Sequence, residues 1–377
     1  MLNPEQLFNN LRELDISFYA GVPDSLLKNF CAYITDNLDK DSHIITANEG
    51  SAVGLGIGYH LATNKTPVIY MQNSGLGNTV NPITSLADPD VYSIPMLLVI
   101  GWRGEPGVKD EPQHVKQGKI TLRQLETMGV DYKVISAETT EAELVEITKT
   151  AAETAKKNSC PFALVVKKGT FSAYSLQNNP AGNNEMLREE AIQILSQQLG
   201  DSDAIVSTTG VTSRELFEIR AGKNQGHQRD FLTVGGMGHT SQIALGIALQ
   251  KKDRQVYCFD GDGSTLMHMG ALPINASMKC KNFKHIIFNN GAHDSVGGQP
   301  TVALEIDLPA IAKASGYAEV RSVATRAELE EAGKWLANTP GPVLLEVRVN
   351  KGFRKDLGRP TTTPVENKNA LMEFLSK

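Results

Sequence analysis

The sequence has few cysteines, no surplus of positive charge and no long hydrophobic run, and each shortage excludes a class of protein. Its four cysteines are Cys31, Cys160, Cys258 and Cys280. They are widely separated and form no CxxC pair, so we expect neither a disulfide framework nor a cysteine-based zinc site. We predict four reduced and mostly buried thiols.

The net charge of −5 provides none of the positive field that binding to a phosphate backbone normally requires. The longest apolar stretches, such as residues 94–102, fall well short of the roughly 20 residues that a membrane span needs. The start of the chain reads as an amphipathic helix and lacks the features of a secretory signal. We therefore expect a soluble, cytoplasmic protein that binds neither nucleic acid nor membrane.

The chain of 377 residues is long enough for two domains. Short β-rich segments alternate with helical patterns on both sides of a polar stretch at 172–186, which contains Pro, Gly and four Asn. The expected strands lie in 43–47, 67–71, 94–101, 131–136, 162–169, 204–210, 231–238, 255–263, 285–291 and 342–349. This alternation predicts an α/β fold of two doubly wound, parallel-sheet domains at 1–172 and 188–377, joined by a linker at 173–187.

Two motifs follow neighbouring strand-like segments of the second domain. Gly261–Ser264 reads GDGS, and Asn289 and Asn290 come after the next apolar run. Ligands of parallel sheets bind beyond the carboxyl ends of strands, and carboxylate, amide and carbonyl oxygens suit Mg²⁺. The glycines beside Asp262 let the backbone approach a diphosphate. A plain turn and an Asn-rich loop are the alternative, because Gly-Asp and Asn-Gly are ordinary turn dipeptides.

Together these motifs resemble the signature of thiamine-diphosphate-dependent enzymes, a GDG followed by NN. The resemblance implies that Asp262, the side chain of Asn290 and the main chain of Ala292 bind Mg²⁺. It also implies that three residues contact or flank the diphosphate, namely Gly261, Gly263 and Ser264. The fold implied is the thiamine-diphosphate-binding fold, with a pyrimidine-binding and a diphosphate-binding domain and no central third domain.

The segment 233–240, TVGGMGHT, resembles the part of these enzymes that holds the aminopyrimidine. By this resemblance Met237 wedges the cofactor into a bent shape, and the carbonyl of Gly235 accepts a hydrogen bond from the aminopyrimidine. Thr212 and Ser213 are candidate diphosphate contacts. Taken alone, Met237 would be read as an ordinary core residue, since Met readily fills gaps.

Glu49, in ITANEGSAVG at 45–54, is similar to the glutamate that hydrogen-bonds N1′ of the pyrimidine in this family. That bond favours the imino tautomer, whose nitrogen removes the thiazolium C2 proton. A surface glutamate that complements a helix dipole is the alternative. In this family the two domain types meet across a subunit interface, so the resemblance implies a homodimer or larger assembly in which Glu49 serves a neighbour's cofactor.

Segments at 20–28, 73–86, 100–114, 261–272, 289–301 and 351–368 resemble the phosphonopyruvate decarboxylases of this family. The resemblance implies a 2-oxo acid substrate, 3-phosphonopyruvate, that is converted to phosphonoacetaldehyde and CO₂. A carboxylate and a phosphonate both need cationic or amide donors. The candidates are Arg103, Lys109, Gln113, Arg354, Lys355 and Arg359, of which the cluster at 354–359 is preferred to Lys109; solvated surface cations are the alternative.

The proton donor stays open at this point. Asp24 follows GVP as an active-site aspartate does in related decarboxylases, and Gln113 and His114 stand where those relatives carry a His pair. Position 296 is Val where the pyruvate-type branch has a glutamate. Asp24, His114 and His293 are therefore competing candidates.

Other activities remain as alternatives. Sulfopyruvate decarboxylase is the nearest, and only the segment 351–368 separates it from our prediction. A non-catalytic protein that has kept the cofactor fold is disfavoured because Glu49, Asp262 and Asn290 are all present. Acetolactate synthase-like carboligation normally involves the third domain, and a nicotinamide enzyme would need a GxGxxG motif after its first strand.

Overall fold

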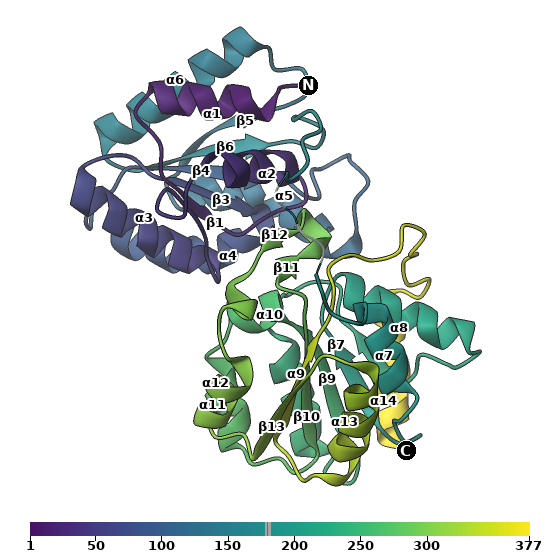
Figure 1. Ribbon diagram of the computed structural model, residues 1–377. Coiled ribbons are helices and arrows are strands. Elements are labelled where there is room, and N and C mark those ends of the chain that lie inside the picture. Colours follow the sequence, from purple (N-terminus) through teal and green to yellow (C-terminus); the bar gives the residue numbers. More distant parts are fainter. Residues whose placement is uncertain (178, 180–181) are drawn as a thin grey trace. The chain divides into compact units, whose positions relative to one another are not determined.

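The computed structural model describes residues 1–177, 179 and 182–377 (Figure 1). The chain divides into two compact units, Met1–Asn179 with Ser295–Gln299, and Pro180–Asp294 with Pro300–Lys377. Of the linker predicted at 173–187, residues 178, 180 and 181 lie outside the described residues.

The first unit contains a parallel sheet of six strands in the order β2-β1-β3-β4-β6-β5. The strands are β1 (Tyr19–Gly21), β2 (His43–Ile45), β3 (Val68–Gln72), β4 (Met96–Gly101), β5 (Asp131–Ile135) and β6 (Pro161–Val166). Five of them overlap segments predicted from the sequence, with ends that differ by a few residues. β1 was not predicted, because its three residues are too short for a pattern to register.

Helices cover both faces of this sheet. One face packs against α1 (Pro4–Glu13), α2 (Lys28–Asn37) and α6 (Glu141–Asn158). The other packs against α3 (Glu49–Thr63), α4 (Leu76–Pro82) and α5 (Pro112–Thr127), with η1 (Asn73–Gly75) and η2 (Ile83–Ala87) beside α4. Alternate residues of β4 enter the two cores, which is why the strand reads as a continuous apolar run.

The second unit repeats this plan with six parallel strands in the order β13-β14-β10-β9-β7-β8. The strands are β7 (Ala204–Ser207), β8 (Asp230–Leu232), β9 (Val256–Gly261), β10 (Phe283–Asn289), β13 (Glu319–Val323) and β14 (Val343–Arg348). β13 was not predicted, since it carries exposed charged residues at the sheet edge. Two doubly wound parallel sheets confirm the predicted fold class.

Helices α7 (Arg188–Ser196), α8 (Val211–Gly222) and α13 (Arg326–Asn338) pack on one face of the second sheet. Helices α9 (Thr240–Gln250), α11 (Ala271–Ser277) and α12 (Leu308–Ala314) pack on the other. The remaining elements are α10 (Asp262–Met267), β11 (Ala292–His293), η3 (Asp294–Val296), β12 (Gln299–Pro300), η4 (Val302–Leu304) and α14 (Pro364–Ser376).

Because all six strands of each sheet run parallel, their carboxyl ends share one edge in each unit, and the predicted site residues follow these ends. The four cysteines are free, three of them buried and Cys280 half-buried. None of the described helices is long and apolar enough to cross a membrane.

Candidate active site

In the second unit, the ends of β9 and β10 bring the two predicted metal motifs together. Gly261 is in register with Phe288, so Asp262, which follows β9, lies beside Asn289, the last residue of β10. Thr301 then joins the two turns: its hydroxyl donates a hydrogen bond to Asp262 Oδ2, and its main-chain N–H donates to Gly291 O at 2.9 Å. Sheet register and this double link fix the spacing of the two turns.

The chemistry of these turns fits a divalent cation. Asp262 is only 3% exposed, and burial raises the pKa of its carboxyl group to about 6. A buried carboxylate is costly to ionise unless a positive charge offsets it. Its oxygen atoms, with nearby amide and main-chain oxygens, form the donor set that Mg²⁺ prefers. Asp262 therefore suits a metal ligand better than a purely structural carboxylate.

The side chain of Asn290 is held in one orientation. Its Nδ2 donates a hydrogen bond to Asp294 Oδ2 at 2.6 Å, and its Oδ1 accepts the N–H of Ala292 at 3.1 Å. Asp294 in turn accepts the N–H of Gly352 at 2.9 Å and lies 3.6 Å from Nη1 of Arg188. The amide oxygen of Asn290 keeps a second lone pair that a metal could use.

Ser264 links three segments that follow different strands. Its hydroxyl oxygen accepts the N–H of Gly238 at 3.1 Å and the hydroxyl of Thr208, also at 3.1 Å. Gly238 has φ +87°, and a Cβ there would lie 2.2 Å from Nδ1 of His268, so only glycine fits. This turn carries the half-buried Met237 and Gly235.

The two predicted contacts on α8 differ in their surroundings. Thr212 is buried in the first turn of the helix, next to Gly210, which has φ +90°. Ser213 is also buried, and its hydroxyl lies 2.7 Å from both Ser207 Oγ and Thr208 O. Protein groups thus already engage the Ser213 hydroxyl, and its contact with a diphosphate stays a prediction.

His293 lies against the GDGS turn. A Cβ on Gly263 would lie 3.1 Å from the imidazole ring of His293, so the two are in close contact. Burial lowers the pKa of His293 to about 4. The ring is therefore mainly neutral near neutral pH.

In the first unit, Glu49 begins α3 and is 5% exposed. Its Oε2 accepts a 2.7 Å hydrogen bond from Nδ2 of Asn78. A Cβ on Gly75 would lie 2.3 Å from Glu49 Oε1, so the carboxylate packs directly on that glycine. The packing on Gly75 and the hydrogen bond from Asn78 together fix the carboxylate of Glu49 at the carboxyl edge of the sheet.

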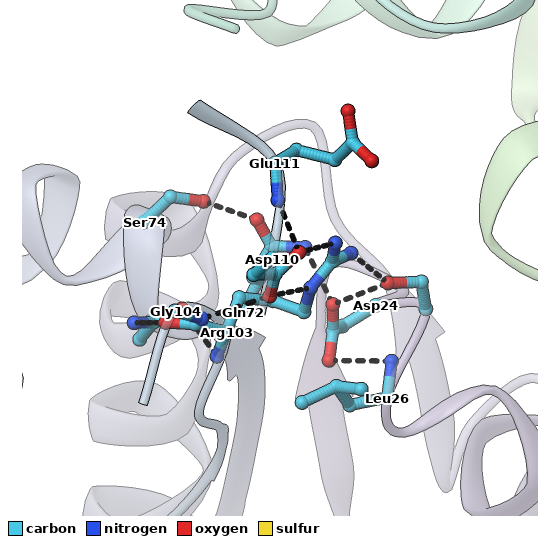
Figure 2. A network of polar contacts seen from close by, with 10 residues as sticks. Asp24, Leu26, Gln72, Ser74, Arg103, Gly104, Asp110 and Glu111 are labelled. Carbon is cyan, nitrogen blue, oxygen red and sulfur yellow. Dashed lines mark hydrogen bonds and ion pairs between the residues drawn. The ribbon is translucent and has the colours of Figure 1, made fainter. Parts of the chain in front are cut away.

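Asp24 is fully buried and follows β1 at the same edge of the sheet. Figure 2 shows the polar contacts around its carboxylate. Its carboxylate accepts hydrogen bonds from Nε2 of Gln72 at 2.6 Å and from the main-chain N–H groups of Leu26 and Leu27 at 3.0 and 3.2 Å. Burial nevertheless raises the pKa of Asp24 above its ordinary value. The segment 72–78 thus contacts Asp24 at its start and Glu49 at its end, which brings the two acids to one edge.

The predicted substrate cation Arg103 is already paired. Its guanidinium makes a forked ion pair with Asp110 and donates to Ser25 Oγ at 2.7 Å (Figure 2). His114 is buried and Gln113 half-buried in the first turn of α5, whereas Lys109 is exposed on the loop before it. Lys109 is therefore exposed to solvent, whereas the side chain of Arg103 is fixed by its ion pair with Asp110.

The cation cluster at 354–359 is partly neutralised. Arg354 forms ion pairs with Glu189 at 2.9 Å and Asp356 at 3.2 Å, and also with Glu218. Lys355 and Arg359 are exposed. Arg214 of α8 donates to the carbonyls of Leu357 and Gly358, so the segment is tied to α8.

Three residues of these clusters received no role from the sequence: Thr301, Asp294 and Asn78. All lie within segments that resemble phosphonopyruvate decarboxylases, but short polar residues in loops carry no pattern of their own. Their position close to a predicted ligand or acid was the only available signal, and it requires the folded chain.

Comparisons with known proteins bear on both units. Residues 4–126 match the family model described as the N-terminal TPP binding domain of thiamine pyrophosphate enzymes, and residues 210–347 match the corresponding C-terminal TPP binding domain. Thiamine pyrophosphate is another name for thiamine diphosphate. The two matches fall on the two parallel sheets.

Several known proteins are similar to this chain. A phosphonopyruvate decarboxylase of Streptomyces viridochromogenes is 31% identical over 100% of this chain and 96% of its own length. A sulfopyruvate decarboxylase of Methanosarcina acetivorans is 30% identical over 88% of this chain and 87% of its own length. The sulfopyruvate decarboxylase subunit beta of Methanocaldococcus jannaschii is 35% identical over 50% of this chain and 97% of its own length.

Proposed function

This chain belongs to the thiamine-diphosphate-dependent decarboxylases that include the phosphonopyruvate and sulfopyruvate decarboxylases, and we propose that it converts 3-phosphonopyruvate to phosphonoacetaldehyde and CO₂. It is a carboxy-lyase of 2-oxo acids that uses thiamine diphosphate, for which Mg²⁺ is the usual partner metal. The choice of substrate rests on one observation: the similarity to a phosphonopyruvate decarboxylase extends over the whole chain.

The residues of the second unit would hold the cofactor. Asp262, Asn290 and the carbonyl of Ala292 would bind Mg²⁺, and the GDGS turn would receive the diphosphate. When bound, thiamine diphosphate would supply a nucleophilic carbon and a sink for the electrons of the C–C bond that breaks. The protein has to hold that group, exclude water and deliver a proton.

Glu49 would hold a proton at N1′ of the pyrimidine. We propose that it does so for the cofactor of a second copy of the chain, in a homodimer or larger assembly. Helix α3, which Glu49 begins, leaves Leu55 and Leu61 exposed, Leu61 at 72%. An exposed apolar helix face is often an interface, which supports burial of α3 against another copy.

Proton delivery to the product is assigned to Asp24 ahead of His114 and His293. Burial raises the pKa of Asp24, so a larger share of this carboxyl group stays protonated than in an exposed aspartate. Asp24 also lies on the edge of the sheet that presents Glu49. His114 and His293 remain the alternatives.

The phosphonate would be bound by cations that the fold leaves at the surface. Lys355, Arg359 and Lys109 are exposed. The guanidinium of Arg354 is half-buried and forms ion pairs with Glu189 and Glu218. In this proposal Arg354 contacts the substrate only if it gives up one of these glutamates. Arg103, on the loop that precedes α5, and Gln113, in the first turn of α5, would act through their positions.

The test is release of CO₂ by the protein supplied with thiamine diphosphate and Mg²⁺. We expect the highest kcat/KM for 3-phosphonopyruvate, with sulfopyruvate and pyruvate measured in parallel. A higher value for either of these would overturn the choice of substrate. Glu49→Gln should bind the cofactor and lose most of its turnover, since the proton at N1′ would no longer be held by a carboxylate; unchanged turnover would remove Glu49 from the mechanism.

Sulfopyruvate decarboxylation is the second candidate, because a sulfopyruvate decarboxylase is nearly as similar over most of the chain. The two substrates differ in the charge of the terminal group. Arg359→Ala should therefore raise KM for 3-phosphonopyruvate more than for pyruvate, which lacks that group. An equal change for both substrates would exclude Arg359 from phosphonate binding. A protein that binds the cofactor but releases no CO₂ from any 2-oxo acid would be a non-catalytic member of the fold.

A further inference from the structure

A row of buried polar side chains lies behind the Asp262 turn, on the face of the second sheet that packs against α9 and α11. Cys258 and Asp260 belong to β9 and His285 to β10, and their potential ligand atoms lie within 4.8 Å of one another. Asp260 and His285 are 2% and 1% exposed. The composition resembles a transition-metal site, but Oδ1 of Asp260 and Nδ1 of His285 already make hydrogen bonds, whereas Nε2 of His285 makes none.

The contacts continue from the turn to the surface of α9. Asp260 Oδ1 accepts the N–H of Gly261 at 2.9 Å, and Oδ2 lies 3.5 Å from Nε2 of His285. Nδ1 of His285 lies 3.0 Å from the hydroxyl of Tyr317. That hydroxyl accepts from Nδ2 of Asn275 at 3.2 Å, and Asn275 Oδ1 accepts from Nε2 of Gln242 at 2.6 Å.

The hydrogen bonds of this row run in one direction, from Gln242 through Asn275 and Tyr317 to His285. Because the Tyr317 oxygen accepts from Asn275, its own proton is available to His285 Nδ1, and burial raises the pKa of Tyr317, which keeps the phenol protonated. A neutral imidazole that accepts at Nδ1 carries its proton at Nε2. Nε2 lies 3.5 Å from Oδ2 of Asp260 without making a hydrogen bond, so its N–H acts on the carboxylate through its partial positive charge.

We propose that Asp260 is a positioning residue for the metal site: it fixes the main chain at Gly261, and the row His285–Tyr317–Asn275–Gln242 fixes Asp260. This inference rests on the proposed function, in which Asp262 is a Mg²⁺ ligand. Gly261 immediately precedes Asp262, so a shift of its peptide moves the ligand. Mutation of residues that orient metal ligands without touching the metal typically lowers metal affinity by roughly 10–100-fold.

The test measures the Mg²⁺ concentration that half-saturates decarboxylation at fixed thiamine diphosphate. Asp260→Asn keeps the shape of the side chain but turns an N–H donor toward the N–H of His285. We expect the half-saturating concentration to rise by about tenfold, with kcat restored at high Mg²⁺. Tyr317→Phe, which leaves the ring in place, should raise it by a smaller factor, and it preserves the test if Asp260→Asn fails to fold.

Two control variants distinguish an error in the proposed metal site from an error in the proposed role of Asp260. Asp262→Asn should abolish the response to Mg²⁺; if it does not, the proposed metal site itself is wrong. Cys258→Ala lies on the same face beside His285 but outside the row, and its half-saturating Mg²⁺ should match that of the unchanged protein. The thermal midpoint of each metal-free variant shows whether the fold is intact.

Two results would overturn the positioning role. One is an unchanged Mg²⁺ requirement in folded Tyr317→Phe and Asp260→Asn while Asp262→Asn abolishes the response. The other is an equivalent of transition metal in the purified protein that Cys258→Ala removes. That metal would make the three buried side chains a second metal site.

Discussion

The side-chain amide of Asn290 donates a 2.6 Å hydrogen bond to Oδ2 of Asp294. This contact turns the amide oxygen of Asn290 away from Asp294, which is the orientation a metal ligand requires. Asp294 is itself held by the N–H of Gly352 and by the nearby guanidinium of Arg188. The orientation of Asn290 in the predicted metal motif therefore depends on a residue that lies outside this motif.

Replacing Asp294 with Ala should weaken Mg²⁺ binding. Without its acceptor, the amide of Asn290 is free to rotate, and we expect the half-saturating Mg²⁺ concentration to rise by about tenfold. Titration of decarboxylation with Mg²⁺ measures the change. Asp201→Ala, which removes an exposed carboxylate from the same unit, is the matched control and should leave the titration unchanged. Identical titrations for both variants would show that Asp294 does not orient Asn290.

Gly75→Ala should displace the carboxylate of Glu49 without unfolding the protein. The added Cβ would lie 2.3 Å from Oε1, and the end of a glutamate side chain can move aside. We expect kcat to fall by about 100-fold, the scale of general acid-base contributions, while the thermal midpoint changes little.

The control for this substitution is Gly77→Ala, two residues further along. A Cβ on Gly77 meets nothing within 4 Å, so turnover should stay near its original value. Equal activity in the two variants would contradict the close packing of Glu49 on Gly75.

Asp110→Asn should destabilise the first unit more at neutral pH than in acid. Although burial opposes it, the Arg103 guanidinium and two main-chain N–H groups hold the pKa of Asp110 well below its usual range. A carboxyl group with a lowered pKa contributes stability above its unfolded pKa, and this contribution is lost as pH falls toward the folded value. We expect the free energy of unfolding, measured with urea, to fall by about 2 kcal/mol at neutral pH and by less in acid. A loss independent of pH would assign the effect to packing.

His43→Gln should flatten the loss of stability in mild acid. Burial lowers the pKa of His43 from 6.5 to about 4, so the unfolded chain binds a proton more readily than the folded one in this range. Stability therefore falls as pH decreases from about 6.5 to 4, by up to roughly 3 kcal/mol for this group. Unfolding midpoints across this range should decline less steeply in the variant. An unaltered slope would show that His43 is protonated without cost in the folded protein.

The sequence alone located the residues most central to the proposed site. Asp262 and Asn290 follow apolar strand segments, and parallel strands bring their carboxyl ends to one edge, so the adjacency of the two turns follows from pattern and geometry. Glu49 was identified by its resemblance to the family's glutamate, and in the structure it is the first residue of α3. The strands β1 and β13 were missed because one is too short and the other too polar for hydrophobic periodicity to register.

Only the tertiary structure decided which polar groups meet. Arg354 and Arg103 were both plausible anion ligands in the sequence, but Glu189, Glu218 and Asp110 neutralise them in the folded chain. Thr301 reaches Asp262 from a loop far along the chain, and the row from Gln242 to Asp260 joins residues of five different segments. Hydrophobic periodicity and the alternation of strands with helices arise from local, repeating forces that leave a trace in the sequence. A hydrogen bond between distant loops depends on a few tenths of an ångström of packing and leaves none.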